Sequence, residues 1–122
     1  MTYAQLGHRV MQLARSLREA GVGPGDRVAV VLPNDGPFVV SVFAAVMSGA
    51  IVVPLDVAIR PKGFADIVRD CDVKALIVDE HALVRLKPVL NRQSHKPGII
   101  ILQRESNRES GTNWPAFEDI RK

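Results

Sequence analysis

The chain has 122 residues, 47% of them hydrophobic and 24% charged, and its net charge at pH 7 is +3. A chain of this length suits one domain, and its apolar stretches end well before the ~20 residues that a transmembrane helix requires. We therefore exclude a membrane span, and because the opening residues lack the pattern of a secretory signal we expect the cytoplasm. A single cysteine, Cys71, excludes an internal disulfide and is expected to be a small buried residue.

The first predicted element is an amphipathic helix that begins after Thr2. Thr2 and Gln5 have the spacing of a capping box, in which each side chain bonds the backbone N–H of the other residue. Apolar residues then recur at helical spacing on one face, at Leu6, Val10, Leu13, Ala14 and Leu17. Gly21 suits the left-handed residue that follows the end of a helix.

Residues 26–56 predict a βαβ unit. The segment 27–32 has an apolar core without polar alternation, which is typical of a strand buried on both faces of a parallel sheet. Pro37 suits the first turn of a helix over 38–47, and this helix is apolar almost all round, which indicates little contact with solvent. A second buried strand is expected at 51–54.

The same alternation continues to the end of the apolar pattern. A helix around residues 64–71, a strand at 75–78, a weaker helix at 80–90 and a strand at 99–102 are expected. Helix and strand alternate throughout. The sequence therefore predicts an α/β fold of three layers, a mostly parallel sheet with helices on both faces, joined by right-handed crossovers.

The pattern divides the chain into an α/β unit over residues 1–102, a polar loop over 103–113 and a terminal segment over 114–122. The loop has no period and few apolar residues, which predicts an exposed or disordered segment. Trp114 and Phe117 supply apolar anchors, and we expect them to dock the terminal segment on the domain as a short turn.

The turn PNDGPF, residues 33–38, is a candidate nucleotide site because it joins a strand to a helix. A dinucleotide fingerprint needs three glycines, whereas this turn has one, and Pro37 lacks a backbone N–H that a phosphate would use. Asp35 instead suits a helix N-terminus, where a negative charge is stabilising. A second candidate, ESGTN at 109–113, lacks a lysine and a preceding apolar strand. We interpret both segments as connections.

Two pairs of carboxylates are candidates for acid–base chemistry. Asp70 with Asp72, and Asp79 with Glu80, form no recognisable catalytic constellation in the sequence. This favours the solvated ends of helices or strands. We assign no catalytic, cofactor-binding or metal-ligating residue to the chain.

The histidines and the basic residues are further candidates for binding a ligand. His8, His81 and His95 are scattered without metal-site spacing, and His8 is expected on the surface. Residues 85–108 are basic, with cations at Arg85, Lys87, Arg92, Lys96, Arg104 and Arg108. This stretch has no aromatic residue on which bases could stack, so we expect a solvated face and no nucleic acid. An anionic partner for the stretch is the alternative.

Four segments in a fixed order carry a resemblance to a known family. They are TYAQL at 2–6, GVGPGDRVAVVLPN at 21–34, GAIVVPLD at 49–56 and DCDVKALIVDE, which ends at residue 80. In this order and spacing the chain resembles the N-terminal part of an acyl-CoA synthetase or AMP-dependent ligase. This adenylate-forming superfamily also holds luciferases and the adenylation domains of nonribosomal peptide synthetases.

The resemblance implies an enzyme that uses ATP and magnesium to convert a carboxylic acid into an acyl-adenylate. The acyl group then passes to the thiol of CoA or of a carrier's phosphopantetheine, and for the acyl-CoA branch this implies a role such as fatty acid metabolism. The family's phosphate loop, adenine-binding motif, ribose-binding Asp and catalytic Lys all come after the matched segments. No catalytic, ATP-binding or magnesium-binding residue is therefore carried over to this chain.

Because the match starts at once, we interpret the chain as an excised or truncated piece of such a ligase, or as a short relative without catalysis. The partners implied are the remainder of the AMP-binding domain and the C-terminal domain. Without them, exposed apolar surface is expected to cause self-association. The alternatives are a piece of a peptide synthetase's adenylation domain, and a non-enzymatic α/β interaction module with a basic face.

Overall fold

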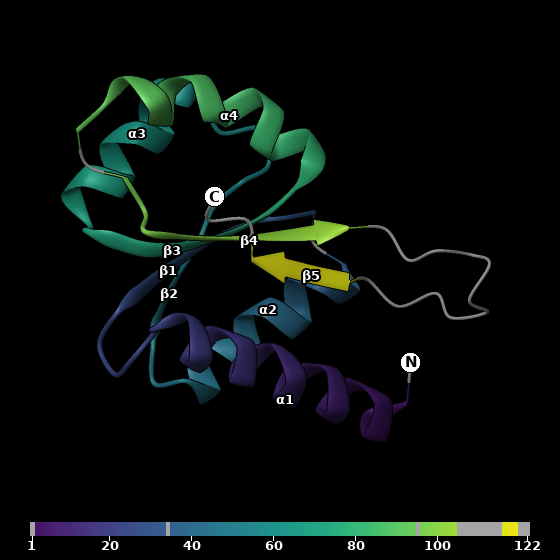
Figure 1. The fold of residues 1–122 in the computed structure, drawn as a ribbon. Helices are drawn as coiled ribbons and strands as arrows, with labels where there is room; N and C mark the ends of the chain where they lie inside the picture. Colours follow the sequence, from purple (N-terminus) through teal and green to yellow (C-terminus); the bar gives the residue numbers. More distant parts are fainter. Residues whose placement is uncertain (1, 34, 95, 105–115, 120–122) are drawn as a thin grey trace.

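The computed structural model describes residues 2–33, 35–94, 96–104 and 116–119. Helices and strands alternate along this part of the chain until β4, as the sequence predicts (Figure 1). In chain order the elements are α1 (Tyr3–Ala20), β1 (Arg27–Val31), α2 (Gly36–Met47), β2 (Ile51–Pro54), α3 (Pro61–Asp70), β3 (Val73–Asp79), α4 (Glu80–Arg92), β4 (Ile99–Arg104) and β5 (Ala116–Asp119).

The strands form one sheet in the order β2-β1-β3-β4-β5. The first four of these are parallel to one another, and β5 runs antiparallel to β4. Helices α1 and α2 cover one face of the sheet, and α3 and α4 cover the other (Figure 1). The predicted three-layer α/β fold is confirmed. Within the described residues, every helix is too short or too polar to cross a bilayer.

Two apolar clusters, one on each face of the sheet, form the core. Alternate residues of β1 supply both of them, because successive side chains of a strand point to opposite faces. Val28 and Val30 pack with α1 and α2, whereas Ala29 and Val31 pack with α3 and α4. All four side chains are fully buried. The apolar run without alternation is therefore explained by burial on both sides.

The predicted ends of α1 are confirmed. Thr2 Oγ1 accepts the backbone N–H of Gln5 at 3.1 Å, and Gln5 Oε1 accepts the backbone N–H of Thr2 at 2.9 Å. Gly21 ends the helix with φ of 112°. Gly49, after α2, has φ of 80°, and a Cβ there would lie 3.2 Å from Pro24 Cα. A side chain at Gly49 would thus be strained twice, by the backbone and by this contact.

Three expectations differ from the structure. Gln103 and Arg104 extend β4 beyond the predicted strand, because they pair with β5 rather than opening a loop. Phe117 lies in β5, so residues 116–119 are an antiparallel strand and not a short turn; this strand hydrogen-bonds the edge of β4. Trp114 and most of the predicted loop lie outside the described residues. Cys71 is half-buried rather than buried, because it follows the last turn of α3.

Two phenylalanines test the layered core. Phe64 on α3 is 0% exposed and Phe43 on α2 is 51% exposed, although both lie within helices. We expect Phe64→Ala to lower the free energy of unfolding by about 3–5 kcal/mol, because it opens a cavity in the core. Phe43→Ala should lower it by less than about 1 kcal/mol. Urea unfolding followed by circular dichroism measures both, and equal losses would contradict the assigned core.

Candidate functional site

The carboxyl edge of the parallel sheet contains a topological switch point. After β1 the chain passes to α2 on one face, and after β3 it passes to α4 on the opposite face (Figure 1). The strand order around this point, β2-β1-β3-β4, is that of doubly wound folds, which bind ligands in the crevice between β1 and β3. The turn after β1 is thus at the position where this topology favours a ligand.

The described residues at the switch point do not fit a phosphate group. Asp35 is the N-cap residue of α2, as the sequence predicts, and its side chain is exposed. Pro37, in the first turn of α2, has no backbone N–H to donate. Across the switch point, Asp79 Oδ1 accepts the backbone N–H of Ala82 at 2.8 Å and caps α4. Carboxylates therefore follow both strands, and they would repel a nucleotide's phosphates.

The next loop at this edge, between β2 and α3, is held by Arg85 of α4. The Arg85 guanidinium donates to the backbone carbonyls of Val57 and Ile59. Within the same loop, Asp56 Oδ1 accepts the backbone N–H of Ala58 at 2.7 Å. The sequence placed Arg85 in a basic stretch that could meet an anion. In the structure this cation instead fixes a loop of its own chain.

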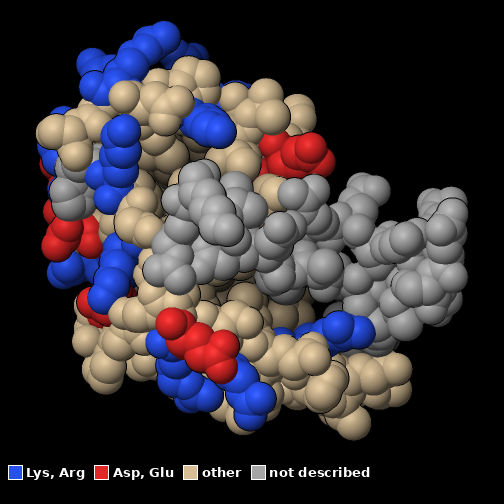
Figure 2. Space-filling view, viewed as in Figure 1, with Lys and Arg blue, Asp and Glu red and all other residues tan. Residues whose placement is uncertain are grey.

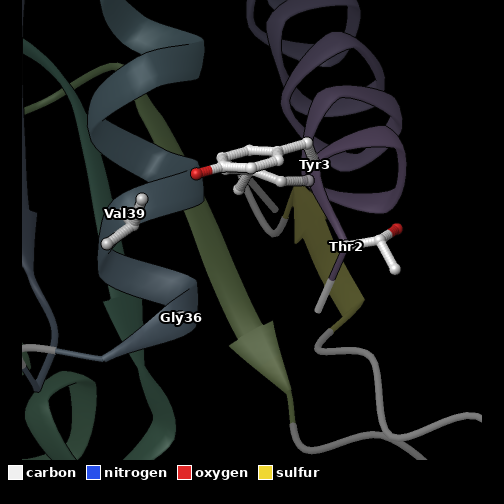
Figure 3. Close-up of a pocket in the computed structure, with 5 residues that line it drawn as sticks. Thr2, Tyr3, Gly36 and Val39 are labelled. Atoms are coloured by element: carbon white, nitrogen blue, oxygen red, sulfur yellow. The ribbon is translucent and has the colours of Figure 1, made fainter.

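An apolar groove of about 580 Å³ lies between the first turns of α1 and α2. Its lining is Thr2, Tyr3, Leu6, Gly36 and Val39. Figure 3 shows Tyr3 extending from α1 toward α2, while the Thr2 side chain points away from α2. Tyr3 is 94% exposed, so its ring forms an open wall of the groove. The described residues of its lining offer apolar contact and no charged group.

The outer face of α2 carries a continuous row of exposed apolar side chains. Val39, Phe43, Val46 and Met47 are exposed and spaced at i, i+4, i+7 and i+8, which places them on one side of the helix. We call these four residues the α2 stripe. Ile51 of the edge strand β2 is also exposed, but on the opposite face of the sheet. The sequence predicted an all-round apolar helix, but residue type alone could not show which side stays uncovered.

At the opposite, amino edge of the sheet lies a polar hollow of about 390 Å³. Its lining comes from the starts of β1, β3 and β4, at Gly25, Asp26, Arg27, Asp72, Val73, Lys74, Lys96 and Gly98. Figure 2 shows acidic and basic side chains interspersed along this edge, at the left. The pairing register of β1 and β3 shifts between Arg27 and Val28, so Lys74 stands opposite no residue of β1. Its ammonium lies 3.0 Å from Asp26 Oδ2.

Hydrogen bonds hold the carboxylate of Asp26 in its charged form. The backbone N–H of Gly23 donates to Asp26 Oδ2 at 2.7 Å, and this bond, followed by the bond from Lys74, lowers the pKa of Asp26 below its ordinary value of 3.8. A folded-state pKa below the unfolded one means that the charged carboxylate stabilises the fold above pH 3.8. This stabilisation is lost as the pH falls through the folded-state value.

We therefore expect Asp26→Asn to lower the free energy of unfolding by about 1–2 kcal/mol at pH 7, because a charged acceptor is replaced by a neutral one. The difference from the parent chain should shrink as the pH falls below 3.8. Asp66→Asn, which removes an exposed ion pair with Arg69, is the control and should cost under about 1 kcal/mol. Urea unfolding from pH 7 to pH 3 measures this, and a pH-independent difference would contradict it.

The other candidate residues from the sequence do not gather in one site, although Asp72 and Lys96 share the polar hollow. His8 is exposed on α1, as predicted. Asp70 forms an ion pair with Arg69 at 3.0 Å, and Asp72 lies at the polar hollow with φ of 51°. Within the described residues, no group of three or more His, Cys, Asp or Glu side chains could hold a metal ion. Lys96 also lines the polar hollow, so the basic stretch is not one continuous face.

Comparisons with known proteins agree with this architecture. The family model described as AMP-binding enzyme matches residues 1–120. The chain belongs to the AMP-binding enzyme family. The feruloyl-CoA synthase of Amycolatopsis sp is 41% identical over 83 residues, which cover 67% of this chain and 17% of that protein. The family match therefore agrees with the resemblance to adenylate-forming ligases that the sequence segments indicated.

Two further relatives show the range of the family. A probable non-canonical nonribosomal peptide synthetase, CymA of Salinispora arenicola, is 35% identical over 128 residues, which cover 96% of this chain and 2% of that protein. The crystal structure of the anthranilate CoA ligase AuaEII in complex with anthranoyl-AMP matches with a TM-score of 0.77 and 26% identity. That match covers 84% of this chain and 20% of the ligase. The chain therefore spans a fifth or less of these proteins.

Proposed function

We propose that this chain forms the first α/β layers of an ATP-dependent acid–thiol ligase and is inactive without the rest of that enzyme. In the reaction of the proposed ligase, a carboxylate attacks ATP to give acyl-AMP and pyrophosphate, and a thiol then displaces AMP to give a thioester. We propose CoA as the thiol, magnesium as the ion that neutralises the phosphates and the cytoplasm as the location. The carboxylic acid stays open, and a role in fatty acid metabolism stays a prediction.

One observation carries this proposal. The family model matches the whole described fold, yet the switch point of that fold carries carboxylates and a proline where ATP would need donors. The phosphates of ATP do not fit the described residues of this edge, because Pro37 offers no N–H and the carboxylates repel them. The residues that bind the nucleotide would therefore come from other parts of a family-length ligase, and this chain would supply the scaffold behind them.

The second candidate is a piece of the adenylation domain of a nonribosomal peptide synthetase, and the share of this chain that each relative matches supports it. The match to CymA spans 96% of this chain, whereas the match to feruloyl-CoA synthase spans 67%. In that case the acyl acceptor would be the phosphopantetheine of a carrier domain. The non-enzymatic module with a basic face has less support, because Arg85 is engaged by its own chain and Lys96 lies at the opposite edge from the switch point.

A chimera tests the proposed scaffold role. The matched segment of the Amycolatopsis feruloyl-CoA synthase would be replaced by the corresponding residues of this chain. We expect the chimera to catalyse acid-dependent exchange of pyrophosphate into ATP, and the isolated chain to show no exchange above buffer, because it lacks the phosphate-binding groups. Exchange by the isolated chain would contradict the proposal. So would a folded chimera that lacks exchange while the parent synthase has it.

The isolated chain should also self-associate through the α2 stripe, because this apolar surface would be covered in a family-length ligase. We expect the sedimentation coefficient to rise with concentration, and the double variant Phe43→Ser, Val46→Ser to abolish this rise. Val84→Ser is the control, since Val84 on α4 is 70% exposed but lies on the other face of the sheet. A control that abolishes association as well would contradict the assignment to the stripe.

A further inference from the structure

The Arg85 guanidinium joins two parts of the fold that are not neighbours in the sheet. Arg85 lies on α4, which follows β3, and its acceptors are the carbonyls of Val57 and Ile59 in the loop that follows β2. The strand order is β2-β1-β3, so β1 lies between these two strands. Helices α3 and α4 cover one face of the sheet (Figure 1). The contact therefore crosses the carboxyl end of β1 on that face, and we call Arg85 with these two carbonyls the clasp.

The clasp supplies hydrogen bonds that the loop, residues 55–60, does not obtain elsewhere. At its start, the N–H of Leu55 donates to the last turn of β1 pairing, at 2.9 Å. A turn at Asp56 then satisfies the next two N–H groups of the loop. Within the described residues, no group other than Arg85 donates to the carbonyls of Val57 and Ile59. The far half of the loop is thus held in place from α4.

The shape of the guanidinium matters more here than its charge. Within the part of the chain that the structure describes, no carboxylate forms an ion pair with Arg85. A guanidinium is a planar fork whose N–H groups have fixed directions, so one side chain can bond two separate carbonyls. A lysine ammonium has the same charge without this fixed geometry. We therefore expect lysine to replace Arg85 poorly.

The clasp borders the switch point between the carboxyl ends of β1 and β3. The turn after β1 leads to α2 on the opposite face of the sheet, whereas the clasp lies on the face of α3 and α4. A group bound between the two strand ends would thus have the start of α2 on one side and the loop on the other. Because phosphates are disfavoured there, this group is an uncharged part of a substrate. Val57 in the loop is exposed and apolar, which suits such a contact.

We propose that Arg85 is a positioning residue of the ligase, which holds the 55–60 loop across the end of β1 as a wall of fixed shape for a substrate's uncharged part. This inference rests on the proposed function. The substrate is the carboxylic acid through its body or the thiol through its arm, and their KM values distinguish the two. A wall that contacts the substrate equally before and during the reaction affects KM and leaves kcat nearly unchanged.

Kinetics of a feruloyl-CoA synthase chimera that carries residues 1–120 of this chain, the span of the family match, test the positioning role. Arg85→Lys and Arg85→Met should raise the KM of the acid or of CoA at least about 5-fold, and change kcat less than about 2-fold. Lys87→Met, exposed on the same helix, is the control and should change neither. Unchanged KM values for both substrates would overturn the proposal. So would an Arg85→Lys variant equal to the parent, because charge alone would then suffice.

Amide hydrogen exchange in the 122-residue chain tests the clasp without reference to activity. In Arg85→Met the amides of Ala58 and Ile59 should exchange at least about 10-fold faster, whereas the Leu55 amide, bonded to β1, should keep its rate. Equal rates in parent and variant would overturn the proposal. If Arg85→Met does not fold, Arg85→Lys decides by the same comparison. A chimera that never exchanges pyrophosphate, beside a selectively loosened loop, would fail the proposed function and leave the clasp standing.

Discussion

Burial of the parallel sheet on both faces is the constraint on which the rest of the structure depends. The central strands carry apolar side chains in both directions, so the chain must place helices above and below them. α1 and α2 satisfy one face, and α3 and α4 the other. The helix that follows β1 and the helix that follows β2 lie on opposite faces of the sheet. This change of side creates the switch point between β1 and β3. The edge where a ligand would bind is thus a consequence of how the core is covered.

The layered fold could be predicted because its signals are local. The capping box of Thr2 and Gln5, the helix end at Gly21 and the apolar strands each depend on residues close in sequence. Strand β5 could not be predicted, since Phe117 lies in a short segment whose structure depends on pairing with β4. The role of Arg85 was missed for a similar reason. Its partners are carbonyl groups 26 and 28 residues away, and no side-chain pattern marks a carbonyl.

The candidate site shows the limits of reading function from a fold. The topology favours a ligand between β1 and β3, and the turn after β1 contains a glycine, yet Asp35, Pro37 and Asp79 disfavour a phosphate there. The doubly wound order fixes where a site can form, and the residues decide what binds. Here the Asp79 carboxylate caps α4, and Asp35 stands at the N-cap position of α2 without a capping hydrogen bond. The exposed α2 stripe is a second uncovered surface of the fold. Its side chains are apolar and therefore unsuited to binding a nucleotide's phosphates.

Calorimetric titration of the 122-residue chain with ATP and magnesium tests the central claim most directly. The account predicts no heat beyond that of dilution, with the chain shown to be folded by circular dichroism in the same sample. Stoichiometric binding that requires magnesium would contradict it. That result would place a nucleotide site within this chain, and the carboxylates at the switch point would then have to hold the metal ion.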